Sequence, residues 1–366
     1  MTERQSLIET LEDAISHKDI AARAELLRAI TQLFTSSCAT LSDEHVGLFD
    51  DVMGQLLNEI DHSARAAFGV QLADIPNAPP KIIHALASDD SIEVAGPILS
   101  RSERLDEASL VESAMTKSQD HLLAISRRRS LGEAVTDVLV ERGNQQVAIS
   151  VAANLGAKFS EFGYSALVER SQNDSDLALG VLSRPEIPRQ HMLRLFSSAS
   201  ENVRHKLEAM DPRKVGLIRE MIAQASDQIQ TTSREHSATF AWARSQVESL
   251  KFFGKLSEPQ LLEFALAGKF DETVVAMSLM CEMPFGIVER AIVNDEADQL
   301  LVLAKSIGLS WETTKAILLV QSQARCRSTE DIARFNASYT RLRPETAKRA
   351  VQFYRLRKKS ENGPAN

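Results

Sequence analysis

The sequence predicts an all-α protein, and three observations carry that prediction. The chain has only 15 Gly and 11 Pro among 366 residues, a smaller share than turn-rich β proteins use. Apolar residues make up 43% and charged residues 25%, as in ordinary globular proteins, which excludes a wholly disordered chain. Along most of the chain, apolar positions recur three or four residues apart, which is the spacing of one buried helix face.

The first 75 residues are expected to form an N-terminal helical segment. Their apolar periodicity predicts helices at 3–16, 20–35 and 42–67. The segment Asp74–Pro80 then contains three prolines, two of them adjacent. Because proline lacks an amide donor and disfavours a helical conformation in the residue before it, we place a boundary in this segment.

From residue 81 onward a local pattern of two short apolar helices and two polar turns recurs. The clearest match sets Asp90–Arg101 on Asn173–Arg184, and looser copies occur at Gln146–Asn154 and Thr273–Cys281. Each helix pair is too short to bury its own apolar face, so neighbouring pairs must stack into a continuous core. The pattern therefore predicts a HEAT-like helical repeat array, an α-solenoid, with irregular spacing between the copies.

The array is expected to form two lobes joined by a long helical connector. A polar run separates two apolar stretches within the connector and predicts a hinge near Gln230. The predicted parts are 81–213 (HEAT-like helical repeats), 214–254 (helical connector), 255–359 (C-terminal helical lobe with a basic end) and 360–366 (disordered tail).

Several stretches of the chain resemble a known family. They are Val94–Ser102, Ala267–Met280, Pro284–Ile292, Ile307–Ile317, Asp331–Phe335 and Arg343–Arg355. These stretches are similar to an alphaproteobacterial family of uncharacterised proteins, a domain of unknown function, over most of residues 20–358. The resemblance implies an all-helical, cytosolic, bacterial protein, and it brings no catalytic residue and no ligand.

The common catalytic motifs are missing from the sequence. It has no P-loop, no dinucleotide fingerprint, no nucleophile elbow and no zinc-protease motif. Glu59 and His62 form half of a di-iron ExxH pair, but no second copy exists, so we interpret them as a solvated helix face. The eight His are isolated from one another and from Cys, which is typical of surface or capping residues. We expect no catalytic residue, no cofactor and no metal site.

Cysteine and methionine have a structural interpretation beside a functional one. The three Cys lack CxxC spacing, which favours a reducing compartment without disulfides. Cys281 lies in an apolar run and is interpreted as a small buried residue rather than a redox nucleophile. Met277, Met280 and Met283 are expected to fill gaps in the core, with an adaptable partner surface as the alternative.

Arginine also closes two of the repeat helices. Arg101 and Arg184 each follow a Ser at the end of a matched copy. We interpret each pair as a helix end with its arginine in solvent, and an anion site is the alternative.

Charge is unevenly distributed along the chain. The whole sequence has a net charge of −8, whereas residues 323–359 contain eleven Lys or Arg and three Asp or Glu. This contrast predicts an acidic body and a basic amphipathic helix, Pro344–Lys359, that docks by its apolar side and displays cations. The candidate partner-binding residues are Arg341, Arg343, Lys348, Arg349, Arg355, Arg357, Lys358 and Lys359.

These observations favour a non-enzymatic helical-repeat scaffold or regulator that binds a protein partner through an extended surface. A homo-oligomer is a further option, and the alternative is a ligand sensor or an enzyme with a pocket between the lobes. Binding of nucleic acid or a membrane surface through the basic helix is less favoured, because the acidic body repels phosphate. Residues 1–30 are rich in charge, and the longest stretch free of charged residues, 143–157, is too short to span a bilayer. We therefore expect a cytoplasmic protein.

Overall fold

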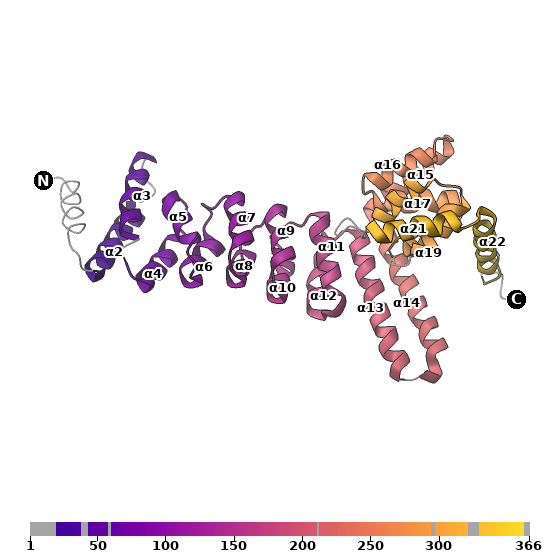
Figure 1. Ribbon diagram of the computed structural model, residues 1–366, viewed down its shortest axis with the longest axis horizontal. Helices are drawn as coiled ribbons and strands as arrows, with labels where there is room; N and C mark the ends of the chain where they lie inside the picture. Colours follow the sequence, from indigo (N-terminus) through magenta and orange to yellow (C-terminus); the bar gives the residue numbers. More distant parts are fainter. Residues whose placement is uncertain are drawn as a thin grey trace. The chain divides into compact units, whose positions relative to one another are not determined.

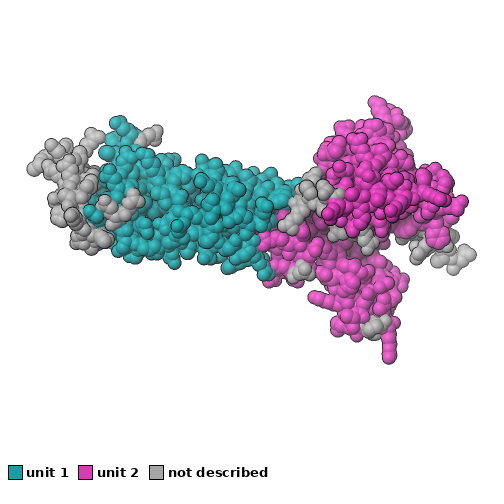
Figure 2. Space-filling view, viewed as in Figure 1, with its two compact units in different colours: residues 1–163 teal, residues 164–366 magenta. Residues whose placement is uncertain are grey.

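The structure, a computed structural model, describes residues 20–37, 43–57, 60–210, 212–293, 297–320 and 329–361. These residues form 21 α-helices and no strand, so the predicted fold class is confirmed at the level of an all-α protein. The chain divides into two compact units, Met1–Gly163 and Tyr164–Asn366 (Figure 2). This division does not test the domain bounds expected from the sequence, which stay predictions.

The first unit consists mainly of short helices in two rows (Figure 1). In one row α4, α6, α8 and α10 pack successively on one another, and in the other row α3 packs on α5 and α7 on α9. The helices are α2 (Ile20–Ser37), α3 (Asp43–Leu57), α4 (His62–Leu72), α5 (Pro80–Ala87), α6 (Ile92–Arg101), α7 (Glu107–Thr116), α8 (Gln119–Ser126), α9 (Glu133–Arg142) and α10 (Gln145–Ala153), and α11 (Glu161–Arg170) crosses the division between the units.

Side-chain caps fix where several of these helices begin. The prediction of a single helix over 42–67 is wrong, because α3 ends at Leu57 and a separate helix starts at His62. Asp61 accepts a hydrogen bond from the amide of Ala64 at 2.8 Å, which satisfies one of the free donors at the start of α4. The helix predicted at 3–16 lies outside the described residues.

Corresponding helices of the first row bury corresponding apolar stripes. The stripe residues, none of them accessible to solvent, are Val94, Ala95, Ile98 and Leu99 in α6, Leu122 and Ile125 in α8, and Val147, Ala148, Val151 and Ala152 in α10. The copy in α8 was not recognised in the sequence, because polar His121 and Ser126 take the first and last positions of its buried stripe. The row therefore has a more regular step than the sequence pattern indicated.

A ladder of hydrogen bonds, here called the capping ladder, joins helix ends two places apart. A polar side chain at or just after the end of one helix donates to free carbonyl oxygens at the end of the helix two places earlier. The donors and their carbonyl partners are Lys117 with Ser88, Arg128 with Leu99 and Ser102, Arg142 with Ala114, and Asn154 with Ser126 and Arg128. Donor and acceptor are 26 to 29 residues apart in every case. Each set of bonds in the capping ladder therefore spans one turn-helix-turn-helix step.

The second unit contains a helical hairpin and a bundle. Its helices are α12 (Ser175–Leu182), α13 (Arg189–Met210), α14 (Val215–Glu235), α15 (Ala238–Phe252), α16 (Glu258–Leu266), α17 (Phe270–Cys281), α18 (Phe285–Val293), α19 (Ala297–Ser306), α20 (Trp311–Val320), α21 (Thr329–Arg341) and α22 (Pro344–Glu361), with short 3-10 turns at Ser171–Asn173 and Pro212–Lys214. Helices α13 and α14 pack side by side as the hairpin (Figure 1). The bundle surrounds one apolar core, with α17 almost wholly buried at its centre.

The predicted connector, 214–254, is interrupted between Glu235 and Ala238 and not at the hinge expected near Gln230. Helix α14 continues through Gln230 and ends at Glu235, and α15 begins after Ser237. The Ser237 hydroxyl accepts a hydrogen bond from the amide of Phe240 at 3.1 Å, which starts the new helix at this point. Helix α15 is part of the bundle, because Phe240 and Val247 lie in its core.

Candidate functional site

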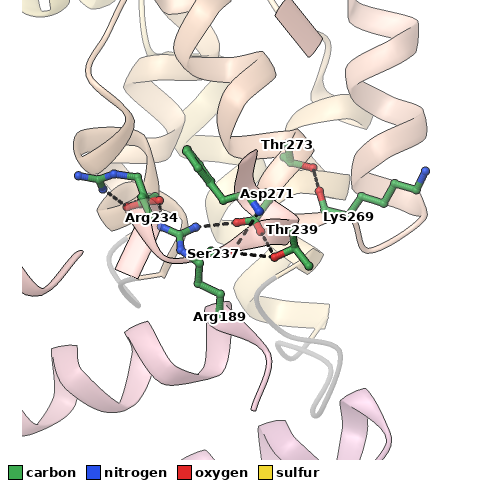
Figure 3. Close-up of polar contacts among 9 residues, drawn as sticks. Arg189, Arg234, Ser237, Thr239, Lys269, Asp271 and Thr273 are labelled. Carbon is green, nitrogen blue, oxygen red and sulfur yellow. Dashed lines mark hydrogen bonds and ion pairs between the residues drawn. The ribbon is translucent and has the colours of Figure 1, made fainter. Parts of the chain in front are cut away.

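Four ionisable side chains from four helices converge inside the second unit. Arg189, at the start of α13, pairs with Asp271 of α17 at 2.6 Å (Figure 3). It also pairs with Glu289 of α18. Arg234, at the end of α14, pairs with the other carboxylate oxygen of Glu289. The four side chains, here called the buried ion cluster, are between 0 and 15% exposed.

Neighbouring groups hold the buried ion cluster in place. The Thr239 hydroxyl donates to the second oxygen of Asp271 at 3.2 Å, so both oxygens of this carboxylate are occupied. The Arg189 guanidinium also lies 4.8 Å from the centre of the Phe240 ring. The cluster is balanced in charge, because two arginines face two carboxylates. Its members come from both helices of the hairpin and from the bundle. It fixes the base of the hairpin.

A cavity of about 510 Å³ lies farther along the hairpin, between α13, α14, α18 and Tyr354 of α22. Its apolar wall includes Leu193, Phe196 and Ile222. Its polar wall presents three serine hydroxyls and five charged side chains. These are Ser197, Ser200, Ser226, Glu201, Arg204, Arg219, Asp227 and Arg290.

The arginines of this hairpin cavity are paired with carboxylates. Arg290 pairs with Asp227, and burial lowers the pKa of its guanidinium. Arg219 pairs with Glu208 at 2.7 Å, and that hydrogen bond lowers the pKa of the Glu208 carboxyl. The residues that line the cavity include no His, Cys or Lys. The described lining therefore combines an apolar wall with serine hydroxyls and ion-paired side chains.

The basic C-terminal helix docks by its apolar side, as its amphipathic pattern predicts. Ala347 and Val351 are buried, and α22 packs on α19. Of the candidate partner-binding residues, Arg341, Arg343, Lys348 and Arg349 are exposed. Arg355 differs, because it is only partly exposed and donates to Glu282 at 2.9 Å and to the carbonyl oxygen of Cys281. The side chains of Arg357, Lys358 and Lys359 lie outside the described ones.

Some of the predicted polar residues are buried rather than exposed. Arg184 is fully buried and pairs with Glu186, so the prediction that it lies in solvent is wrong. Arg101 is exposed, as predicted, and pairs with Asp74. His121 and His191 are also buried. The ring of His121 forms hydrogen bonds with the Ser118 hydroxyl and the Asp89 carbonyl oxygen, and these bonds make its burial tolerable.

The structural interpretation of the sulfur-containing residues is supported. Cys281 is fully buried, and burial raises the pKa of its thiol to about 12. Met277 and Met283 are buried and Met280 is partly buried, all within the bundle core. Among the described residues no group of His, Cys, Asp and Glu is arranged to hold a metal ion.

The buried ion cluster was missed in the sequence, although one signal was present. Glu289 lies between Val288, Ala291 and Ile292, on a stripe otherwise made of apolar residues. A carboxylate in such a stripe requires a cationic partner, because an unpaired buried charge is strongly unfavourable. The identity of that partner could not be found from spacing, because Arg189 lies 100 residues away.

The short capped helices of the first unit and the ion-paired bundle of the second define a two-unit, all-α protein. The chain belongs to a bacterial family of uncharacterised proteins, DUF2336, whose family model matches residues 94–352. This match confirms the family resemblance of the sequence at the level of a bacterial family. No curated protein and no solved structure matches the chain significantly. Of the described helices, none is long and apolar enough to cross a membrane.

Proposed function

We propose that the protein is a non-enzymatic scaffold that binds a protein partner through the surface of a HEAT-like helical array. The capping ladder carries the proposal. Hydrogen bonds between groups 26 to 29 residues apart join corresponding ends of successive helix pairs, and equivalence of successive pairs is the property of a solenoid. The step is shorter than the 40 or so residues of HEAT repeats, so the likeness is one of architecture.

A groove on the first unit is the part of this surface best suited to a partner. It lies between α6 and α8 and has a volume of about 510 Å³. Ile92, Pro97 and Leu123 give it an apolar wall, and Arg101 and Arg127 lie beside them. Arg101 already pairs with Asp74, whereas Arg127 is exposed. A partner segment that combines apolar and acidic side chains fits this groove.

Affinity capture with groove variants tests the proposal. The full-length tagged chain, crosslinked in its native cells, is expected to retain a discrete protein, and Leu123→Glu or Arg127→Glu is expected to lose it. Leu155→Glu is the matched control, because Leu155 is 72% exposed on the same unit and does not line the groove. Equal capture by groove and control variants, or retention of small molecules alone, would contradict a scaffold that uses this groove.

The hairpin cavity favours a ligand sensor as the second candidate function. Its volume suits a small metabolite, and its arginines and serines suit an anionic group that displaces a carboxylate from its pair. Mass spectrometry of metabolites retained by the full chain tests this function. Arg290→Met is the cavity variant, and Arg334→Met, at an exposed position of α21, is the control. A sensor is contradicted if both variants retain the same molecules as the native chain.

A further inference from the structure

Three exposed aromatic residues, here called the aromatic stripe, are Trp242 and Phe252 on α15 and Phe253 at its C-terminal cap. Their exposed fractions are 60, 84 and 67%. Trp242 lies about three turns before Phe253 and therefore on the same side of the helix. Phe240, Ala243 and Val247 form the opposite side, which is buried in the bundle core. The aromatic stripe is therefore not needed for packing within the described residues.

The end of the aromatic stripe is a well-defined turn. Gly254 has a φ of +67°, a conformation that glycine adopts without strain. The amides of Phe253 and Lys255 donate to the carbonyl oxygens of Ser249 and Leu250 at 3.0 and 2.8 Å. These bonds close the helix, and the two phenyl rings lie 5.3 Å apart in an edge-to-face arrangement. The phenyl pair is thus held at the surface before any partner binds.

The charge around the turn is positive. Lys251 and Lys255 flank the phenyl pair, are exposed, and form no ion pair within the described residues. Of the acids nearest in sequence, Glu248 pairs with Arg244 at 2.7 Å, whereas Glu258 accepts hydrogen bonds from the neutral groups of Ser310 and Thr313 and keeps its negative charge. Residues 244–258 hold three cationic and two acidic side chains, which leaves a net charge of +1 around the turn, although the chain as a whole is acidic.

We infer that the aromatic stripe is a peripheral docking site for an anionic lipid surface. Trp and Phe settle at the boundary between headgroups and acyl chains, and flanking Lys adds attraction to acidic headgroups. A protein partner fits the pattern less well, because protein interfaces are depleted in Lys. No described helix could span the bilayer, so the contact would be superficial and reversible. The inference does not depend on the proposed scaffold function.

Vesicle flotation with the full chain tests the inference. The protein is expected to float with vesicles of phosphatidylcholine that contain phosphatidylserine, and not with phosphatidylcholine alone. The Phe252→Ser/Phe253→Ser variant should bind about tenfold more weakly, because it loses the apolar anchors. The Lys251→Gln/Lys255→Gln variant should also bind more weakly, with less dependence on salt.

A matched control separates this site from the basic C-terminal helix. Phe353 is 71% exposed beside Arg349 on α22, and Phe353→Ser is expected to float like the native chain. The inference is overturned if the native chain does not float, if the Phe252→Ser/Phe253→Ser variant floats equally well, or if only Phe353→Ser loses binding. It is also overturned if the aromatic stripe joins two copies of the chain. In that case the native chain forms a concentration-dependent dimer and does not bind vesicles, and the Phe252→Ser/Phe253→Ser variant does not form the dimer.

Discussion

Glu289 shows how a charge is accommodated at the level of one residue. Its carboxylate has no solvent exposure, and two arginines from different helices each contact one of its oxygens. Removing one charge from such a cluster leaves the others buried and unpaired, whereas water hydrates the same groups when they are exposed. The free energy of unfolding should therefore depend far more on Glu289 than on any surface acid.

Glu289→Gln is expected to lower the free energy of unfolding of the second unit by about 3 to 5 kcal/mol. Urea unfolding followed by tryptophan fluorescence measures it. The control is Glu345→Gln, which removes an exposed pair with Lys348 and should change the free energy of unfolding by less than about 1 kcal/mol. Equal effects of the two substitutions would show that the buried ion cluster contributes no more than a surface pair.

Cys281 is expected to be unreactive in the folded protein. Burial is the main cause of its raised pKa of about 12, and the nearby charge of Arg355 opposes it only in part. The thiolate is the reactive form, so at pH 8 the folded protein holds almost none of it. In a Cys38→Ser/Cys326→Ser background, a thiol reagent should modify Cys281 at the rate of unfolding and at once in denaturant. Rapid modification of the folded protein at pH 8 would contradict this assignment.

At the scale of the element, Arg128 connects two helices that the sequence places far apart. Its guanidinium donates to Leu99 and Ser102, both at 2.7 Å, and the carbonyl groups it satisfies belong to the end of α6. Burial lowers the pKa of this guanidinium, but two good acceptors compensate for the lost hydration. The capping ladder therefore contributes to stability and also sets the distance between neighbouring helices.

Arg128→Met is expected to lower the free energy of unfolding of the first unit by about 2 to 3 kcal/mol, because hydrogen bonds from charged groups are lost and carbonyl oxygens are left unpaired. Hydrogen exchange should also accelerate at the end of α6. The matched control is Arg129→Met, one residue away and exposed, which should change stability by less than about 0.5 kcal/mol. If the two variants unfold alike, the ladder is not a stabilising device.

The elements differ in how far the sequence could predict them. The spacing of apolar residues within a few helical turns predicts the all-α class, the docking side of α22 and the burial of Cys281. The break at Asp61 could have been found from its capping side chain, whereas the copy in α8 was hidden by buried His121 and Ser126. The capping ladder and the buried ion cluster could not be found, because their partners lie 26 to 100 residues apart and spacing holds no information on which ends meet.

At the scale of the whole molecule, each of the two compact units buries apolar side chains. The core built around α17 draws its residues from the second unit alone, from Leu193 to Val351. The buried stripes of α6, α8 and α10 belong to the first unit. A protein of this length that divides into two compact units is expected to unfold in stages rather than in one cooperative step.

The distribution of chromophores makes this staged unfolding measurable. Both tryptophans, Trp242 and Trp311, lie in the second unit, whereas helices of both units contribute to the far-ultraviolet circular dichroism. In urea, Arg128→Met should shift part of the circular dichroism transition and leave the tryptophan fluorescence transition in place. Glu289→Gln should shift the fluorescence transition to lower urea. If each substitution moved both signals equally, the units would unfold as one, and the stability of the array would be inseparable from that of the bundle.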